Sequence, residues 1–192
     1  MTFRLPEALS GADDEAALDL LARYYRPPAA AEGFYTGAVF DTWDSTGTRA
    51  RDVDRFTADD LVAVTFLSVD VDPRAAHALL RERAAEFADL LAAVGPDRDL
   101  VEEERVLGED WAAWRLERAL RALPSTGRTT ASKLLARKRP KLLPIWDKVV
   151  AKTTGTRIAQ WEPLRVALRA EGGVLHRRLL CLRAAGGSSR NR

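Results

Sequence analysis

A single carboxylate stands inside the most basic stretch of the chain. Between Arg128 and Lys152 there are eight basic residues and one acidic residue, Asp147. A carboxylate next to a sugar can stabilise the positive charge that develops when an N-glycosidic bond is cleaved, and it can orient the attacking water. The surrounding cations suit a phosphate backbone. Asp147 is therefore a candidate catalytic residue for a reaction on nucleic acid.

A glycine-containing turn begins this stretch. Pro124 and Gly127 predict that one helix ends and another starts here. The first backbone N–H groups of a helix lack partners within it, and the helix dipole favours an anion at that end. We expect the turn to bind a DNA phosphate, with the cations beyond it supporting the contact. The candidate DNA-binding residues are Ser125, Gly127, Arg128, Thr129, Thr130, Lys133, Arg137, Lys138, Arg139, Lys141 and Lys148, and Trp146 is a candidate for stacking on an extruded base.

Each of these features also has a purely structural interpretation. Asp147 can cap a helix that begins near Trp146, or it can pair with Arg139 or Lys148. The turn can be an ordinary connection between two packed helices, and the basic residues can form a solvated helix face. The residues alone leave both interpretations open.

Charge is strongly separated along the chain. Residues 1–110 hold 11 basic and 24 acidic residues, a net charge of −13, whereas residues 111–192 hold 19 and 4, a net charge of +15. The basic part fits a nucleic-acid partner. The alternatives are that the two parts face each other within the fold, or that the acidic part masks the basic face or mimics DNA toward a protein partner.

The sequence predicts a mainly α protein. Thr57 and Asp60 form a capping box ahead of an apolar run, and Asp110 is the expected cap of the helix before the turn. We expect a long loop with few regular elements over residues 29–55. As domains we expect 1–56, an N-terminal helix and loop packed as part of the domain, then 57–185, the helical domain, and a disordered tail over 186–192. Helices are expected at 13–26, from 57, at 73–94, 110–123, 128–139, 145–152 and 161–184.

Composition narrows the class of protein further. The chain has 192 residues and one cysteine, Cys181, so an intrachain disulfide and a cysteine-only zinc site are excluded. His77 and His176 are isolated, and we expect no metal site. No apolar run reaches the roughly 20 residues of a membrane span, and the first residues do not resemble a secretory signal. We therefore expect a cytoplasmic protein that does not act at a membrane.

The stretch from Leu123 to Asp147 resembles the helix-hairpin-helix DNA glycosylases of the endonuclease III-like superfamily. Their hairpin reads LPGVGRKTA and is followed by a VDTH element, and their catalytic aspartate stands 24 residues after the leading leucine, as Asp147 does here. Gly127, Arg128, Thr130 and Ala131 match the hairpin, and Ile145 and Asp147 match the aspartate element. The chain is also similar to a bacterial domain family of unknown function.

The resemblance implies a helical, glycosylase-like architecture that binds double-stranded DNA, with Asp147 as the catalytic carboxylate. It also implies that a monovalent cation can bind at the turn, and we expect no other cofactor. Thr129 stands where bifunctional members carry a Schiff-base lysine, so the expected enzyme is monofunctional. Ser125 replaces a hairpin glycine, which is tolerable only if this position does not demand positive φ. Val149 replaces the histidine of the VDTH element, and no glutamine wedge is visible near Leu67, which favours the alternative of a non-enzymatic DNA-binding or lesion-sensing module.

Overall fold

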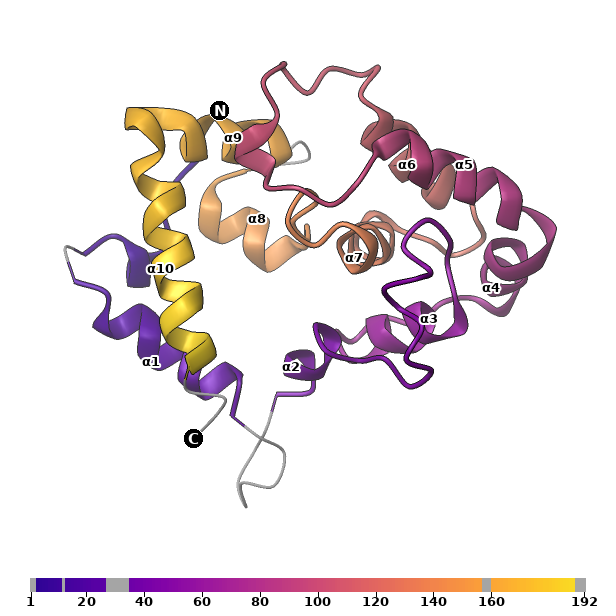
Figure 1. The fold of residues 1–192 in the computed structure, drawn as a ribbon, viewed down its shortest axis with the longest axis horizontal. Coiled ribbons are helices and arrows are strands. Elements are labelled where there is room, and N and C mark those ends of the chain that lie inside the picture. Colours follow the sequence, from indigo (N-terminus) through magenta and orange to yellow (C-terminus); the bar gives the residue numbers. More distant parts are fainter. Residues whose placement is uncertain (1–2, 12, 27–34, 157–159, 189–192) are drawn as a thin grey trace. The chain divides into compact units, whose positions relative to one another are not determined.

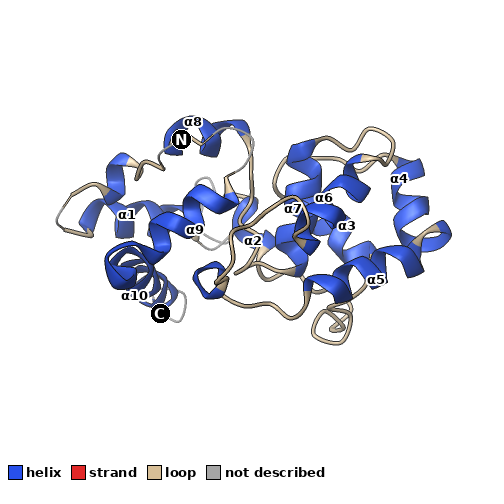
Figure 2. Cartoon of the chain, turned by 90° about the horizontal axis from the view of Figure 1, so that it is seen from above, coloured by secondary structure: helices blue, strands red, loops and turns tan. Residues whose placement is uncertain are grey.

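Every regular element of the part that the structure describes is a helix (Figures 1 and 2), so the predicted mainly α class is confirmed. The structure is a computed structural model, and it describes residues 3–11, 13–26, 35–156 and 160–188. These residues form two compact units, one made of 1–38 and 148–192 and the other of 39–147. The short helix α2 (Gly37–Phe40) lies at the first boundary between them.

The unit of residues 39–147 contains the hairpin. The capping box is present at the start of its first helix, where the backbone N–H of Thr57 donates to Asp60 at 2.8 Å. Asp72 caps a later helix by accepting the N–H of Arg74 at 2.8 Å. The helices are α3 (Ala58–Thr65), α4 (Pro73–His77), the π-helical η2 (Ala78–Glu82), α5 (Ala84–Val94), η3 (Leu100–Glu102), α6 (Ala112–Arg121) and α7 (Arg128–Lys138).

Helix α7 is the centre of this unit. Every residue from Thr130 to Lys138 is buried, so no face of the helix beyond its first turn is left to solvent. Helix α7 packs against both α3 and α6, and α5 packs against α6. The core includes the fully buried side chains of Phe87, Leu91, Leu116, Leu120, Leu134, Leu135, Leu142 and Leu143.

The other unit joins the two ends of the chain. Arg178 ties them together, since its guanidinium donates to the Asp14 carboxylate at 2.7 Å and to the carbonyl of Leu9 at 2.9 Å. Helix α10 packs against α1 and α9. The helices are η1 (Glu7–Leu9), α1 (Glu15–Tyr24), α8 (Lys148–Thr154), α9 (Trp161–Arg169), η4 (Ala170–Gly173) and α10 (Val174–Ser188).

Several predicted boundaries are corrected. The helix expected over 161–184 is two helices, because Glu171, Gly172 and Gly173 adopt φ values of 50°, 64° and 83° between them. Trp111, not Asp110, occupies the cap position of α6, and α8 begins at Lys148 rather than near residue 145. Helix α10 continues through residues 186–188, where a tail was expected; residues 189–192, and 29–34 of the expected loop, lie outside the described residues.

Residues 39–56 belong to the same unit as α3 and α7. They are the second part of the segment 1–56, which we expected to pack as part of the domain. The physical reason is a set of long-range hydrogen bonds: Lys138 donates to the carbonyl of Asp52, and Arg139 to that of Val53.

Candidate nucleic-acid interface

The turn between α6 and α7 contains a residue in the left-handed conformation. Ser125 has a φ of 53°, the value that a glycine would adopt most readily. Its hydroxyl donates to the Asp72 carboxylate at 3.0 Å, and this bond ties the turn to the start of α4. Hydrogen bonds hold the pKa of Asp72 well below its usual range. The bond from the Arg74 guanidinium has the largest effect, followed by the bonds from the Arg74 backbone N–H and the Ser125 hydroxyl. We expected a serine to be tolerated here only if the position did not demand positive φ, but the structure gives Ser125 a positive φ together with the bond to Asp72.

The start of α7 faces open space. Gly127 is exposed and extended, with φ −78° and ψ 175°, and a Cβ built there would meet no heavy atom within 4 Å. No side chain caps the helix. The N–H groups of the first turn and the helix dipole therefore point to a surface that an anion can approach.

A serine on α7 fixes the segment that carries Asp147. The buried Ser132 hydroxyl accepts the backbone N–H of Trp146 at 3.1 Å and lies 2.8 Å from its carbonyl oxygen, to which it can donate. One turn earlier, the Arg128 guanidinium lies 5.6 Å from the centroid of the Trp146 ring. Trp146 is thus held at its backbone and at its ring by α7, and Asp147 follows directly.

Asp147 is electrostatically coupled to a lysine of α7. The Lys133 side chain is buried, and its ammonium donates to the carbonyl of Leu67 at 2.6 Å. Burial lowers the pKa of Lys133, and the charge of Asp147 opposes that effect by raising it. The negative charge of Asp147 therefore acts on a buried lysine of α7.

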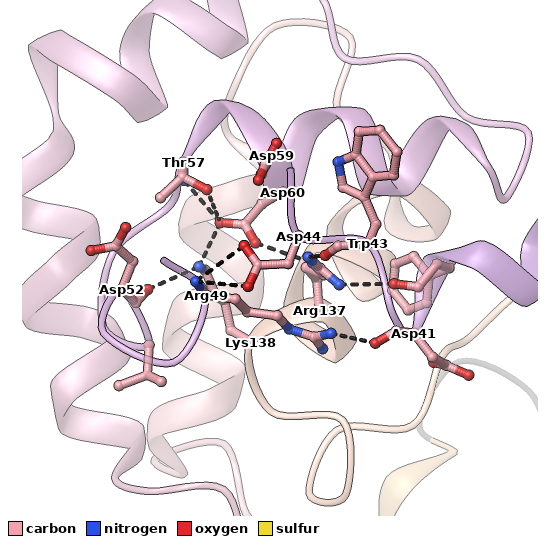
Figure 3. A network of polar contacts seen from close by, with 12 residues as sticks. Asp41, Trp43, Asp44, Arg49, Asp52, Thr57, Asp59, Asp60, Arg137 and Lys138 are labelled. Atoms are coloured by element: carbon pink, nitrogen blue, oxygen red, sulfur yellow. Dashed lines mark hydrogen bonds and ion pairs between the residues drawn. The ribbon is translucent and has the colours of Figure 1, made fainter. Parts of the chain in front are cut away.

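Three of the predicted phosphate ligands are instead part of the core. Arg137, Lys138 and Arg139 have side chains that are 0%, 3% and 2% exposed, so none of them can reach DNA in this fold. Figure 3 shows that Arg137 and Lys138 point toward the segment of residues 41–60. Their carbonyl partners are those of Phe40 and Trp43 for Arg137, Asp52 for Lys138, and Val53, Leu91 and Gly95 for Arg139.

Asp60 is the carboxylate that balances this buried charge. It lies 3.3 Å from Arg137 and 2.5 Å from Lys138, and it is itself 2% exposed. Burial lowers the pKa of both cations, and the charge of Asp60 counteracts this effect. Arg139 pairs with Asp54, so the predicted alternative in which Arg139 pairs with Asp147 is not observed.

The remaining predicted residues divide into three groups. Ser125 and Gly127 are exposed, while Arg128 and Thr129 are half-buried, all four at the turn or the start of α7. Lys141 is exposed, and its backbone N–H donates to Asp97. Thr130 and Lys133 are buried, and Lys148 is exposed but belongs to the other unit.

The sequence interpretation missed the accessible arginines of α6. Arg115, Arg118 and Arg121 are exposed and follow one another every third residue, while Leu116 and Leu120 on the opposite side are buried. The helical period of α6 could have revealed them. Ser132 was also missed, because only its tertiary contact with Trp146 gives it a role.

Neither a metal cluster nor a membrane helix is found among the described residues. No group of three or more His, Cys, Asp or Glu side chains is arranged to hold a metal ion there. No helix in the described ranges has the length and apolar character to cross a membrane.

Comparison with known proteins identifies the chain at the level of a family. The model of a family of unknown function, DUF6308, matches residues 17–191, which is most of the chain, and the protein belongs to this family. A search of curated proteins and a search of solved structures each return no match.

Proposed function

We propose that this protein binds double-stranded DNA through the α6–α7 hairpin and acts as a monofunctional DNA glycosylase on a damaged or mispaired base. The observation that carries the proposal is that Trp146, the residue before Asp147, is bonded through its backbone to Ser132 of α7, the helix whose start has no side-chain cap. With the start of α7 as the phosphate site, a nucleotide bound by its backbone would present its sugar to the Asp147 carboxylate.

The binding step uses the turn. Backbone N–H groups at Gly127, Arg128 and Thr129 would donate hydrogen bonds to one phosphate at the helix start, and the exposed arginines of α6 would neutralise neighbouring phosphates. Because the basic residues from 137 to 139 are buried, the electrostatic surface is smaller than the charge of the sequence suggests. We expect a salt dependence that corresponds to a few phosphate contacts.

The chemical step uses Asp147. Its carboxylate would stabilise the oxocarbenium-like sugar and orient a water that attacks the anomeric carbon. The base would leave the duplex to reach the site, and Trp146 is the candidate for stacking on it. The Lys133 side chain is buried, and its ammonium donates a hydrogen bond to the carbonyl of Leu67. Position 129 is a threonine. With no amine available at either position, hydrolysis by water is favoured over attack by an amine.

A second candidate function is a DNA-binding or lesion-sensing module without catalysis. The segment from Leu67 to Asp72 favours it, because Lys133 and Ser125 tie this segment to the hairpin and none of its residues is a glutamine that could open a duplex. Such a module would bind DNA equally well with asparagine at position 147.

The test is base release under conditions of demonstrated binding. Wild-type protein and Asp147→Asn are incubated with a panel of duplexes that carry single damaged or mispaired bases, at salt concentrations where both proteins bind. The glycosylase proposal expects release of at least one base by wild type and none by the variant. Binding by both proteins without release of any base would contradict the enzymatic part and favour the module.

A further inference from the structure

A buried carboxylate lies between two arginines at the hairpin. The Glu117 side chain is 4% exposed, and its Oε1 oxygen has no hydrogen-bond partner among the described residues. Two guanidinium nitrogens lie just beyond hydrogen-bonding distance of that oxygen, Nη1 of Arg121 at 3.5 Å and Nη1 of Arg128 at 3.6 Å. A buried acid is costly without partners, and the partners that the described residues supply are these two arginines.

The two arginines bracket the turn. Arg121 is the last residue of α6 and Arg128 is the first residue of α7, and their side chains are 42% and 19% exposed. Burial lowers the pKa of Arg128, Glu117 counteracts this, and the positive charge of Arg121 lowers it further. Two guanidinium groups and one carboxylate therefore lie together beside the uncapped start of α7.

This charge and geometry fit a phosphodiester. Guanidinium groups present forked donors that match phosphate oxygens, and two of them can bind one phosphate from both sides. Without the carboxylate, the like charges of Arg121 and Arg128 would repel each other and the side chains would separate. The ring of Trp146 also orients Arg128. Arg121 is oriented by its ion pair with Glu117.

We infer that Glu117 is a positioning residue, which holds Arg121 and Arg128 as a pair for one phosphodiester of the bound DNA. The inference rests on the proposed DNA binding and deepens it, because it assigns the side chains that recognise the phosphate. Glu117 itself touches no phosphate in this role, since its side chain is buried.

The sign of a charge substitution separates this role from simple electrostatics. If Glu117 contributed only its negative charge, removing that charge near a phosphate would strengthen DNA binding. If Glu117 positions the arginines, removing the charge releases them and weakens binding. The two interpretations predict opposite changes for the same variant.

The experiment measures DNA affinity as a function of salt for wild type, Glu117→Gln and the control Glu104→Gln, which removes the same charge from an exposed residue of the same unit. A plain labelled duplex is titrated by fluorescence anisotropy, with circular dichroism to verify folding. We expect the slope of log K against log salt to fall by about one to two units in Glu117→Gln, since each phosphate contact contributes about 0.9. Glu104→Gln should keep the wild-type slope and bind slightly more tightly.

A second variant tests the inference without changing the buried Glu117, whose substitution could disturb folding. Arg121→Gln changes a partly exposed side chain at a helix end, and its slope should fall by about one unit. An unchanged slope in Arg121→Gln, or tighter binding with an unchanged slope in folded Glu117→Gln, would overturn the inference while leaving DNA binding intact. A wild-type protein that does not bind DNA at any salt concentration would overturn the proposed function as well.

Discussion

Removal of the Asp60 carboxylate tests whether the basic run of α7 belongs to the core. In Asp60→Ala, Arg137 and Lys138 keep their buried charges but lose the carboxylate that lies 3.3 Å and 2.5 Å from them. Breaking a buried ion pair from one side costs about 3–5 kcal/mol. Loss of the bond from the Thr57 N–H adds about 1 kcal/mol. We therefore expect the free energy of unfolding to fall by about 4 kcal/mol or more, a large part of the roughly 5–15 kcal/mol typical of a domain.

The assay is urea unfolding followed by circular dichroism, with Asp59→Ala as the matched control. Asp59 neighbours Asp60 on α3 but accepts its hydrogen bonds from Ser45 and Thr46 at exposed positions, so its loss should lower the free energy of unfolding far less than the loss of Asp60. With a urea m-value of about 2 kcal/mol/M, the Asp60→Ala midpoint should lie about 2 M below that of wild type. If Asp60→Ala is too unstable to fold, Asp60→Asn, which removes the charge and keeps an oxygen acceptor, should show a smaller shift in the same direction. A midpoint for Asp60→Ala no lower than that of Asp59→Ala would refute the reasoning.

Three further predictions concern the site and its support. Ser132→Ala removes the hydroxyl that holds the backbone of Trp146. Selective binding to a duplex with a transition-state sugar analogue should be lost, while the affinity for a plain duplex and its salt slope stay the same. A parallel loss of both affinities in anisotropy titrations would contradict a positioning role. Ser125→Gly should be more stable than Ser125→Ala by about 1 kcal/mol in urea unfolding, because both lack the hydroxyl and only glycine adopts the φ of 53° without cost; equal stabilities would show that this conformation is not retained. Bonds from Thr48 and then Arg55 hold the pKa of Asp52 at about 2, below its ordinary 3.8, so its contribution to stability is complete above pH 4 and is lost as the pH falls toward 2. In Asp52→Asn, the melting temperature should change less with pH in that window than it does in wild type. Plots of melting temperature against pH that stay parallel for the two proteins would contradict the assignment.

Local patterns in the sequence were sufficient for much of the fold. The capping box at Thr57 and the helix–turn–helix around Gly127 were predicted from residues within a few positions of each other, and both are confirmed. The break after α9 was missed because the apolar period continues across it, although Gly172 and Gly173 carried the signal.

The role of the basic run could not be predicted locally. Lysine and arginine are almost never fully buried unless they are paired, so Arg137 was expected on the surface. Its partner Asp60 is 77 residues away in the sequence, and no spacing rule connects the two. The same limit applies to Ser132 and Glu117, whose roles depend on contacts that only the folded chain supplies.

Asp147 was selected from its spacing to the hairpin in the sequence, and in the structure the preceding residue, Trp146, is bonded to Ser132 of α7. The role of Asp147 in catalysis stays a prediction. What the fold adds is the set of contacts that would make the role possible: an uncapped helix start, a serine that fixes the neighbouring backbone, and an arginine on the neighbouring ring.

The most direct measurement is the affinity of wild type and Asp147→Asn for two duplexes, one plain and one with a cationic pyrrolidine analogue of an abasic sugar. The analogue imitates the charge of the transition state, so a carboxylate at the anomeric centre should bind it more tightly than plain DNA. We predict a clear preference of wild type for the analogue, lost in Asp147→Asn, with plain-duplex binding unchanged. Equal and salt-sensitive binding of both duplexes by both proteins would contradict a catalytic role for Asp147 and leave a DNA-binding module.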